Sequence, residues 1–286
     1  MAANVNAQGF IPEIWNAAVM RTLEDNLVAR KICRNYSNKV KKHGDTIHFP
    51  GLADPAVNPY NGTISYETLN DGSVSLLIDQ QNYYGFDVTD IEQAMANVDL
   101  KGSQAERAGY VLKKACDSYI MGLYPGAGNS ITDITATMDN IFIGIGEMKQ
   151  KLAENNVDEN DMWLVIPPWV QLKMELAGVK FSINEGINGK GGMSWAKVLG
   201  FDVFVTNQVV DTATTPVSQL MAGSYNAIAF AEALSKSRAL EAETAFSTRV
   251  SGLHVFGAKV IKPKELVKGQ FTYAADTTLN NVTVIS

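Results

Sequence analysis

Residues 44–88, which begin GDTIHFP, decide the fold of this chain. Apolar and polar residues alternate over residues 46–49, and they alternate again between residues 74 and 88, a period of two that predicts strands. The residues between these runs are rich in Pro, Asn and Gly, which favour turns. The segment therefore predicts a long two-stranded excursion with an irregular tip. A lone hairpin is marginally stable in water, so this one needs another surface to lie on.

Helices are predicted on both sides of this excursion. Residues 11–29 place apolar side chains at helical spacing, and Pro12 suits the first helical position, where an N–H is not needed. Residues 99–124 form a second, longer apolar stripe, with Asp99 as a candidate N-cap. The run PGAGN at residues 125–129 ends this helix and predicts a domain junction.

After the junction the sequence alternates between helical and strand patterns, which predicts a mixed α and β unit. No internal repeat interrupts it. The predicted elements are a helix capped by Thr137, a buried strand at 163–166, a helix from 167 to 176, a flexible loop at 184–194, strands at 198–205, 220–222 and 227–230, a long strand at 246–261, and a polar tail from 269.

The charge is unevenly distributed along the chain. The net charge is -6, from 24 Lys and Arg against 30 Asp and Glu. Both ends are basic and the middle is acidic, which suits subunits whose ends meet the middles of their neighbours and also suits solvated faces with no partner. A dedicated nucleic-acid binder would carry denser basic clusters. No stretch is long and apolar enough for a membrane span, so no membrane partner is expected.

No pattern of residues indicates catalysis, a cofactor or a metal. Cys33 and Cys116 are far apart in sequence and are predicted to be buried free thiols. His43, His48 and His254 have no second ligand at helical spacing. The sequence has no nucleophile elbow, phosphate loop or dinucleotide fingerprint. We therefore expect a protein that is not an enzyme.

The order of these elements resembles the Hong Kong 97-type fold of tailed-bacteriophage major capsid proteins. The resemblance covers nearly the whole chain, and the order of its pieces is more specific than any one of them. It is carried by FIPEIW at 10–15, GDTIHFP at 44–50, WLVIPP at 163–168, GFDVFVTN at 200–207, and AIAFAE at 227–232 followed by RV at 249–250 and GAKV at 257–260.

The resemblance implies an α+β fold with an N-terminal arm, an extended β-hairpin loop, a peripheral domain with a long spine helix, and an axial domain. The implied boundaries are 1–43 for the arm, 44–88 for the extended loop, 89–124 with 244–268 for the peripheral domain, 125–243 for the axial domain and 269–286 for a C-terminal tail.

The resemblance also implies a function in a virion. The chain would assemble into hexamers and pentamers of an icosahedral shell around double-stranded DNA, with a separate scaffolding protein and a portal as partners, and would be made in the bacterial host cytoplasm. Expected assembly contacts are Pro12, Trp15, Tyr60, Asn61 and Tyr66. Basic residues that could face DNA without sequence specificity are Arg21, Arg30, Lys31, Arg34, Lys41 and Lys42.

Three other interpretations remain open from the sequence. An encapsulin-like nanocompartment shell would share the fold and differ in its cargo. A phage tail or baseplate component would form rings or tubes. An α/β enzyme with a dispersed site would form a small oligomer, because catalytic residues need not form a motif.

Overall fold

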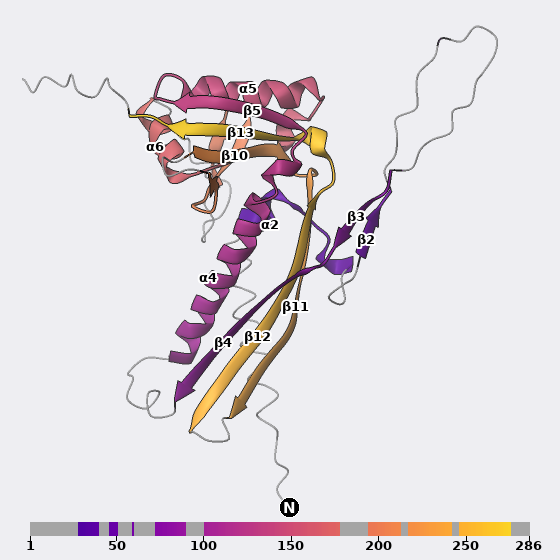
Figure 1. Ribbon diagram of the computed structural model, residues 1–286, viewed down its shortest axis with the longest axis vertical. Helices are drawn as coiled ribbons and strands as arrows, with labels where there is room; N and C mark the ends of the chain where they lie inside the picture. The colour runs from indigo at the N-terminus through magenta and orange to yellow at the C-terminus, as the bar shows by residue number, and fades with distance from the viewer. Residues whose placement is uncertain are drawn as a thin grey trace, which may run out of the picture.

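The computed structural model describes residues 28–39, 46–50, 59, 72–89, 100–177, 194–212, 217–241 and 246–275. Within these residues the strands form three sheets, of four, seven and two strands (Figure 1). The short helix α2 (Val28–Ile32) leads into them from the N-terminal side.

The four-stranded sheet is long and carries one helix. Its order is β1-β11-β12-β4, with β1 parallel to β11 and the other pairs antiparallel. Helix α4 lies along one face of this sheet (Figure 1) and packs through its buried side chains. The bounds are β1 Arg34–Asn35, β4 Gln80–Thr89, β11 Ile228–Glu241, β12 Ser247–Val260 and α4 Leu100–Met121.

The seven-stranded sheet contains a separate core. Its path is β5-β13-β10-β6-β8-β7, and β9 pairs with β10. Helices α5 and α6 bury apolar side chains against it, and Figure 1 shows α5 lying over β5 and β13. The bounds are β5 Asn129–Ala136, α5 Ile141–Glu154, β6 Met162–Ile166, α6 Pro168–Leu176, β7 Ser194–Val198, β8 Phe201–Val205, β9 Val210–Asp211, β10 Val217–Ser224 and β13 Leu266–Tyr273.

The two-stranded sheet is the base of the predicted hairpin. Strand β2 (Thr46–Phe49) pairs antiparallel with β3 (Val74–Leu77), and Thr46 lies opposite Leu77. This pair lies on the side of the four-stranded sheet opposite α4 and points away from the rest of the chain (Figure 1).

Three short connections join the two larger sheets, and they are hydrogen-bonded to one another. The Gly128 N–H donates to the Pro263 carbonyl at 2.8 Å, and the Ile261 N–H donates to the Ala227 carbonyl at 2.8 Å. A Cβ on Gly128 would lie 2.7 Å from the Pro263 carbonyl oxygen, so only glycine permits this approach. The backbone bonds therefore hold the two sheets together at one place.

The α+β class is as predicted, and several strands end where the sequence pattern placed them. Strand β2, strand β6, helix α6 and the long strand β12 match the predicted elements closely. The predicted helix at 11–29 lies outside the described residues except at its last two positions. The predicted loop at 184–194 falls almost wholly outside them.

The extended-loop boundary at residue 88 differs from the structure. Strand β4 pairs along its length with β12 and belongs to the four-stranded sheet, so the projecting pair is only β2 and β3. The reason is that the apolar residues before and after residues 79–82 share one parity, from Val74, Leu76 and Ile78 to Tyr84, Phe86 and Val88, so the pattern carries no sign of the change of partner.

Two further boundaries cut through strands. The predicted limit at residue 243 separates β11 from β12, although these strands form one antiparallel hairpin. The predicted tail from residue 269 begins inside β13, which pairs with β10 and β5. The polar residues of β13 alternate with buried ones. A strand that is half exposed to solvent therefore has the polar composition that predicts a tail.

Smaller differences concern turns. The single strand predicted at 198–205 is two strands, because Leu199 and Gly200 both have positive φ and reverse the chain. Leucine rarely adopts that conformation, so the sequence carried no signal for it. Helix α5 begins at Ile141, and Thr137 contributes its carbonyl oxygen to the Ile141 N–H rather than a side-chain cap.

Two glycines of α5 provide a test of the packing between this helix and the seven-stranded sheet. A Cβ at Gly144 would lie 2.6 Å from Ile134 and 2.8 Å from the buried Phe271 ring, whereas a Cβ at Gly146 would meet nothing within 4 Å. We expect Gly144→Ala to lower the free energy of unfolding by about 1–3 kcal/mol. Gly146→Ala should raise it by up to about 1 kcal/mol, because alanine favours helix. Urea unfolding of both variants checks this, and equal effects would contradict it.

Candidate assembly site

The hairpin base rests on a patch of small side chains. Ile47, Leu76 and Ile78 are buried against Ala229 and Ala231 of β11, together with Val255 of β12. Alanines leave room for the hairpin to approach the sheet closely, and burial of its three large aliphatic side chains stabilises it there. The hairpin therefore starts from a fixed position on its own subunit.

The main chain of the hairpin also contacts β12 directly. A Cβ on Gly257 would overlap the Leu77 carbonyl oxygen and lie 3.1 Å from the Ile78 Cα. The Lys259 ammonium donates to the Ser75 carbonyl at 2.8 Å. These contacts set the direction in which β2 and β3 leave the sheet.

The segment from α2 to the short 3-10 turn η1 (Ser37–Lys39) is bound between the sheet and the hairpin. Strand β1 pairs with β11, and the Tyr36 N–H donates to the Phe230 carbonyl at 2.8 Å. The Tyr36 ring meets the Phe49 ring of β2 edge-on, with centroids 4.9 Å apart. We call residues 28–39 the arm segment, because they join the preceding N-terminal residues to the body of the fold.

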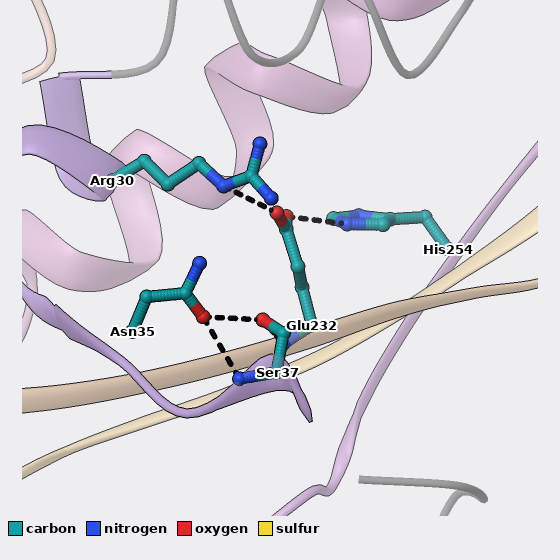
Figure 2. Close-up of polar contacts among 5 residues, drawn as sticks. All are labelled: Arg30, Asn35, Ser37, Glu232 and His254. Carbon is teal, nitrogen blue, oxygen red and sulfur yellow. Dashed lines mark hydrogen bonds and ion pairs between the residues drawn. The ribbon is translucent and has the colours of Figure 1, made fainter. Parts of the chain in front are cut away.

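A buried polar cluster fastens this arm segment to β11 (Figure 2). Arg30 Nε lies 2.8 Å from Glu232 Oε1, and His254 Nε2 lies 3.3 Å from Glu232 Oε2. The Glu232 N–H donates to Ser37 Oγ at 3.0 Å, and the Ser37 hydroxyl and N–H both donate to Asn35 Oδ1. Glu232 is thus held through its side chain and its main chain by residues of the arm segment.

The charge of Glu232 explains why these contacts matter. Its side chain and that of His254 are buried, and moving a carboxylate out of water costs several kcal/mol unless charge and hydrogen bonds compensate. Arg30 supplies the compensating charge while 21% of its side chain stays exposed. Displacement of the arm segment would therefore leave a buried carboxylate without its guanidinium.

Both cysteines lie in the core beside this cluster. Cys33 follows α2, Cys116 is on α4, and both are free and buried, as predicted. Burial raises the pKa of the Cys33 thiol, with a further contribution from Asp117. Burial also raises the pKa of the Cys116 thiol, and the nearby carboxylates act in the same direction. Both thiols are therefore protonated and unreactive at neutral pH.

The sheet face opposite α4 is uncovered by described residues beyond the hairpin base. Tyr83 of β4 is 82% exposed. Leu240 of β11 is also exposed, opposite Arg249, which pairs with Asp87 at 3.4 Å. We call these residues the open sheet face. Large apolar side chains left exposed on one face of a sheet are candidates for an interaction surface.

Most of the predicted site residues lie outside the described residues. These are the assembly residues Pro12, Trp15, Tyr60, Asn61 and Tyr66 and the basic residues Arg21, Lys41 and Lys42.

The other three basic residues that were predicted to face DNA lie on the arm segment. The position of Arg30 differs from that prediction. Arg30 points at Glu232 rather than outward, because the buried carboxylate holds its guanidinium. Arg34 is exposed and donates to Asn226 Oδ1 at 2.7 Å, which ties the arm segment to the connection between the two sheets. Lys31 is half-buried.

Sequence reasoning missed Glu232 as a structural centre. Glu232 stands in the apolar run AIAFAEAL at residues 227–234, where the pattern places a charged residue on the solvent side of a strand. A buried glutamate that follows an alternating run, with a histidine on a later strand, is the only signal, and it is a weak one. Among the described residues no cluster of three metal-binding side chains is found. No described helix is long and apolar enough to cross a membrane.

Comparison with known proteins identifies the fold. No family model matches the sequence, and no curated protein matches it. A structure from Mycobacterium phage Che8 superposes with a TM-score of 0.69 at 23% identity, over 85% of this chain and 91% of that one. The capsid of Ralstonia phage GP4 gives 0.66 at 14% identity, over 86% and 88%. A virus-like particle from Pyrococcus furiosus gives 0.58 at 13% identity, over 90% and 97%.

These matches confirm the predicted Hong Kong 97-type capsid fold. At such identities they concern the fold, and function is a separate step.

The buried thiols give a simple test of the core around the arm segment. Because the pKa of each thiol is raised by burial, we expect neither Cys33 nor Cys116 of the native chain to react with Ellman's reagent at pH 8. Both should react once urea unfolds the chain. Rapid labelling of the native protein would show that the arm segment leaves the core open.

Removing the charge of Glu232 tests the cluster itself. Glu232→Gln leaves the Arg30 guanidinium without its carboxylate, and we expect the free energy of unfolding to fall by about 2 kcal/mol. This is less than the about 3–5 kcal/mol lost when a fully buried pair is broken, because Arg30 keeps contact with water. The matched control is Asp87→Asn, which removes an exposed pair and should change stability by less than about 1 kcal/mol. Equal losses in urea unfolding would refute the special role of Glu232.

Proposed function

We propose that this chain is a major capsid protein that self-assembles into hexamers and pentamers of an icosahedral phage shell and catalyses no reaction. The observation that carries the proposal is the match of most of the fold to solved phage structures, among them the capsid of Ralstonia phage GP4. A hairpin that is anchored at its base and projects from its own chain needs another surface to pack on, because an isolated hairpin is marginally stable in water.

The open sheet face is the surface that we assign to this contact. It lies on the same side of the four-stranded sheet as the hairpin base, and it presents Tyr83 and Leu240. The hairpin of one subunit would lie on this face of the next. Such head-to-tail contacts are heterologous, so they generate rings and closed shells rather than only pairs. Many weak contacts repeated around a shell then give a stable whole.

The domain assignment that we propose follows the two large sheets. The peripheral domain consists of the four-stranded sheet and α4, and the axial domain consists of the seven-stranded sheet with α5 and α6. The extended loop is the part of the chain from β2 to β3, and the arm segment ends the N-terminal arm.

Partners in the virion are also part of the proposal. The shell would enclose double-stranded DNA, contact it through phosphates without sequence specificity, and require a separate scaffolding protein and a portal. The subunit would be made in the host cytoplasm before assembly. Arg34 remains a candidate for DNA contact because its side chain is exposed, whereas the guanidinium of Arg30 is held by Glu232.

A nanocompartment shell is the second candidate. The fold similarity to a virus-like particle from Pyrococcus furiosus favours it, since two kinds of shell can share one fold. Cargo distinguishes the two: particles purified from the native source would contain DNA in one case and a protein in the other.

Replacing the hairpin tip tests the assembly proposal. Phe49 pairs with Val74, so an Asn-Gly turn in place of residues 50–73 keeps the register of β2 and β3. We expect the full chain to form closed shells or capsomer rings in negative-stain electron microscopy. The shortened chain should unfold at nearly the same urea concentration but remain unassembled.

A second variant separates length from sequence. It carries a Gly/Ser linker as long as the segment it replaces, and it should also fail to assemble if tip side chains make the contact. Intact shells from the shortened chain would overturn the role of the hairpin. A full-length chain that stays a monomer or dimer at every concentration would overturn the shell itself.

A further inference from the structure

The outer face of α4 combines exposed apolar side chains with cations. The helix buries Leu112, Cys116 and Ile120 against the four-stranded sheet. On its other side Tyr110 is 59% exposed and Val111 is 57% exposed. In a helix of 3.6 residues per turn, Arg107 and Lys114 lie on this same side, one turn before and one turn after the apolar pair. We call Arg107, Tyr110, Val111 and Lys114 the α4 outer face.

Three described cations of this helix have no anionic partner in the described structure. Among described residues the side chains of Arg107, Lys113 and Lys114 form no ion pair and no hydrogen bond. Elsewhere the exposed cations Lys151, Arg249 and Lys262 are each paired with a carboxylate, whereas Lys197 and Arg238 are exposed and form no ion pair among the described residues. On α4, three such cations accompany two exposed apolar side chains on a single helix.

We propose that the α4 outer face is the docking surface for an acidic segment of a separate protein, with apolar side chains at helical spacing that cover Tyr110 and Val111. The apolar pair would supply the buried centre of the contact, and Arg107 and Lys114 would pair with carboxylates at its rim. This inference rests on the proposed function, because it gives the expected assembly partner a site and a chemistry.

Protein fits this face better than nucleic acid does. DNA is bound by cations and hydrogen-bond donors on phosphates, and the aliphatic Val111 can offer neither. The exposed carboxylate of Glu106, next to Arg107, would also repel a phosphate backbone. In an acidic partner segment, one residue of opposite charge can face Glu106, whereas a uniform polyanion cannot adapt in this way.

A designed peptide is the probe. It is a helical 25-residue peptide with Leu at every third or fourth position and Glu at the flanking positions, labelled for fluorescence anisotropy. It is titrated with the full-length chain below the concentration at which light scattering detects self-association. We expect binding that Arg107→Glu/Lys114→Glu weakens about tenfold or more, the effect of two lost and reversed ion pairs. Val111→Ser should weaken it as well.

Controls make the result specific to α4. Lys197→Glu/Lys264→Glu makes the same change in net charge at exposed positions in β7 and just before β13, and it should alter binding less than about twofold. A peptide with Lys in place of Glu should bind the Arg107→Glu/Lys114→Glu variant and not the unaltered chain. Recovery by charge exchange is a result that a merely unfolded variant could not give.

Three outcomes would overturn the inference. They are no peptide binding, binding insensitive to the α4 substitutions, and tighter binding of a random 30-base-pair duplex with the same dependence on Arg107 and Lys114, which would make this a nucleic-acid surface. Shell formation by the unaltered chain is recorded separately by electron microscopy. Shells without peptide binding would refute the docking surface and leave the proposed function intact.

Discussion

The burial of the Glu232 carboxylate is the constraint on which the rest of the structure depends. Glu232 lies in β11 between the sheet and α4, where an uncompensated charge would be costly. The Arg30 guanidinium compensates the charge of this carboxylate, and Ser37 Oγ accepts a hydrogen bond from the Glu232 N–H. Both residues belong to the arm segment. The arm segment therefore belongs to the core of the fold, although it is only twelve residues long. If β11 carried only hydrophobic residues, it could still pair with β1. The register between the arm segment and β11 would then not be fixed.

The two faces of β11 contact two different layers of the fold. Successive strand residues point to opposite sides, so Phe230 and Glu232 face α4 while Ala229 and Ala231 face the hairpin base. The large residues fill the space under the helix, and the small ones let the hairpin approach. Tyr36 joins the layers, since its N–H bonds to β11 and its ring packs on the hairpin. A shift of the arm segment would thus be felt by α4 and by the hairpin at the same time.

Sequence patterns predicted elements well where one physical rule dominated. The run at 162–166 is buried on both sides and followed by two prolines, so its strand was evident, and β12 was evident from its length. Patterns failed where the chain passed from one sheet to another within a short apolar segment, as between β3 and β4, or where Leu199 took a conformation unusual for leucine. The Glu232 cluster was out of reach because Arg30 and Glu232 are 202 positions apart in the sequence, and pairing over such distances depends on the fold. The order of the elements, rather than any single motif, predicted the fold.

The exposed parts of this subunit are understandable only as parts of something larger. Tyr83 and Leu240 on the open sheet face are large apolar side chains, and full burial of one such residue contributes about 1.5–3 kcal/mol. That gain is too small to hold two subunits together against the entropy of association, and it becomes large only when repeated. Modest exposed area also keeps the unassembled chain from aggregating before assembly begins. A chain with an anchored arm segment, a projecting hairpin and moderately apolar faces therefore suits the shell that we propose, in which contacts form, are corrected and become permanent only at closure.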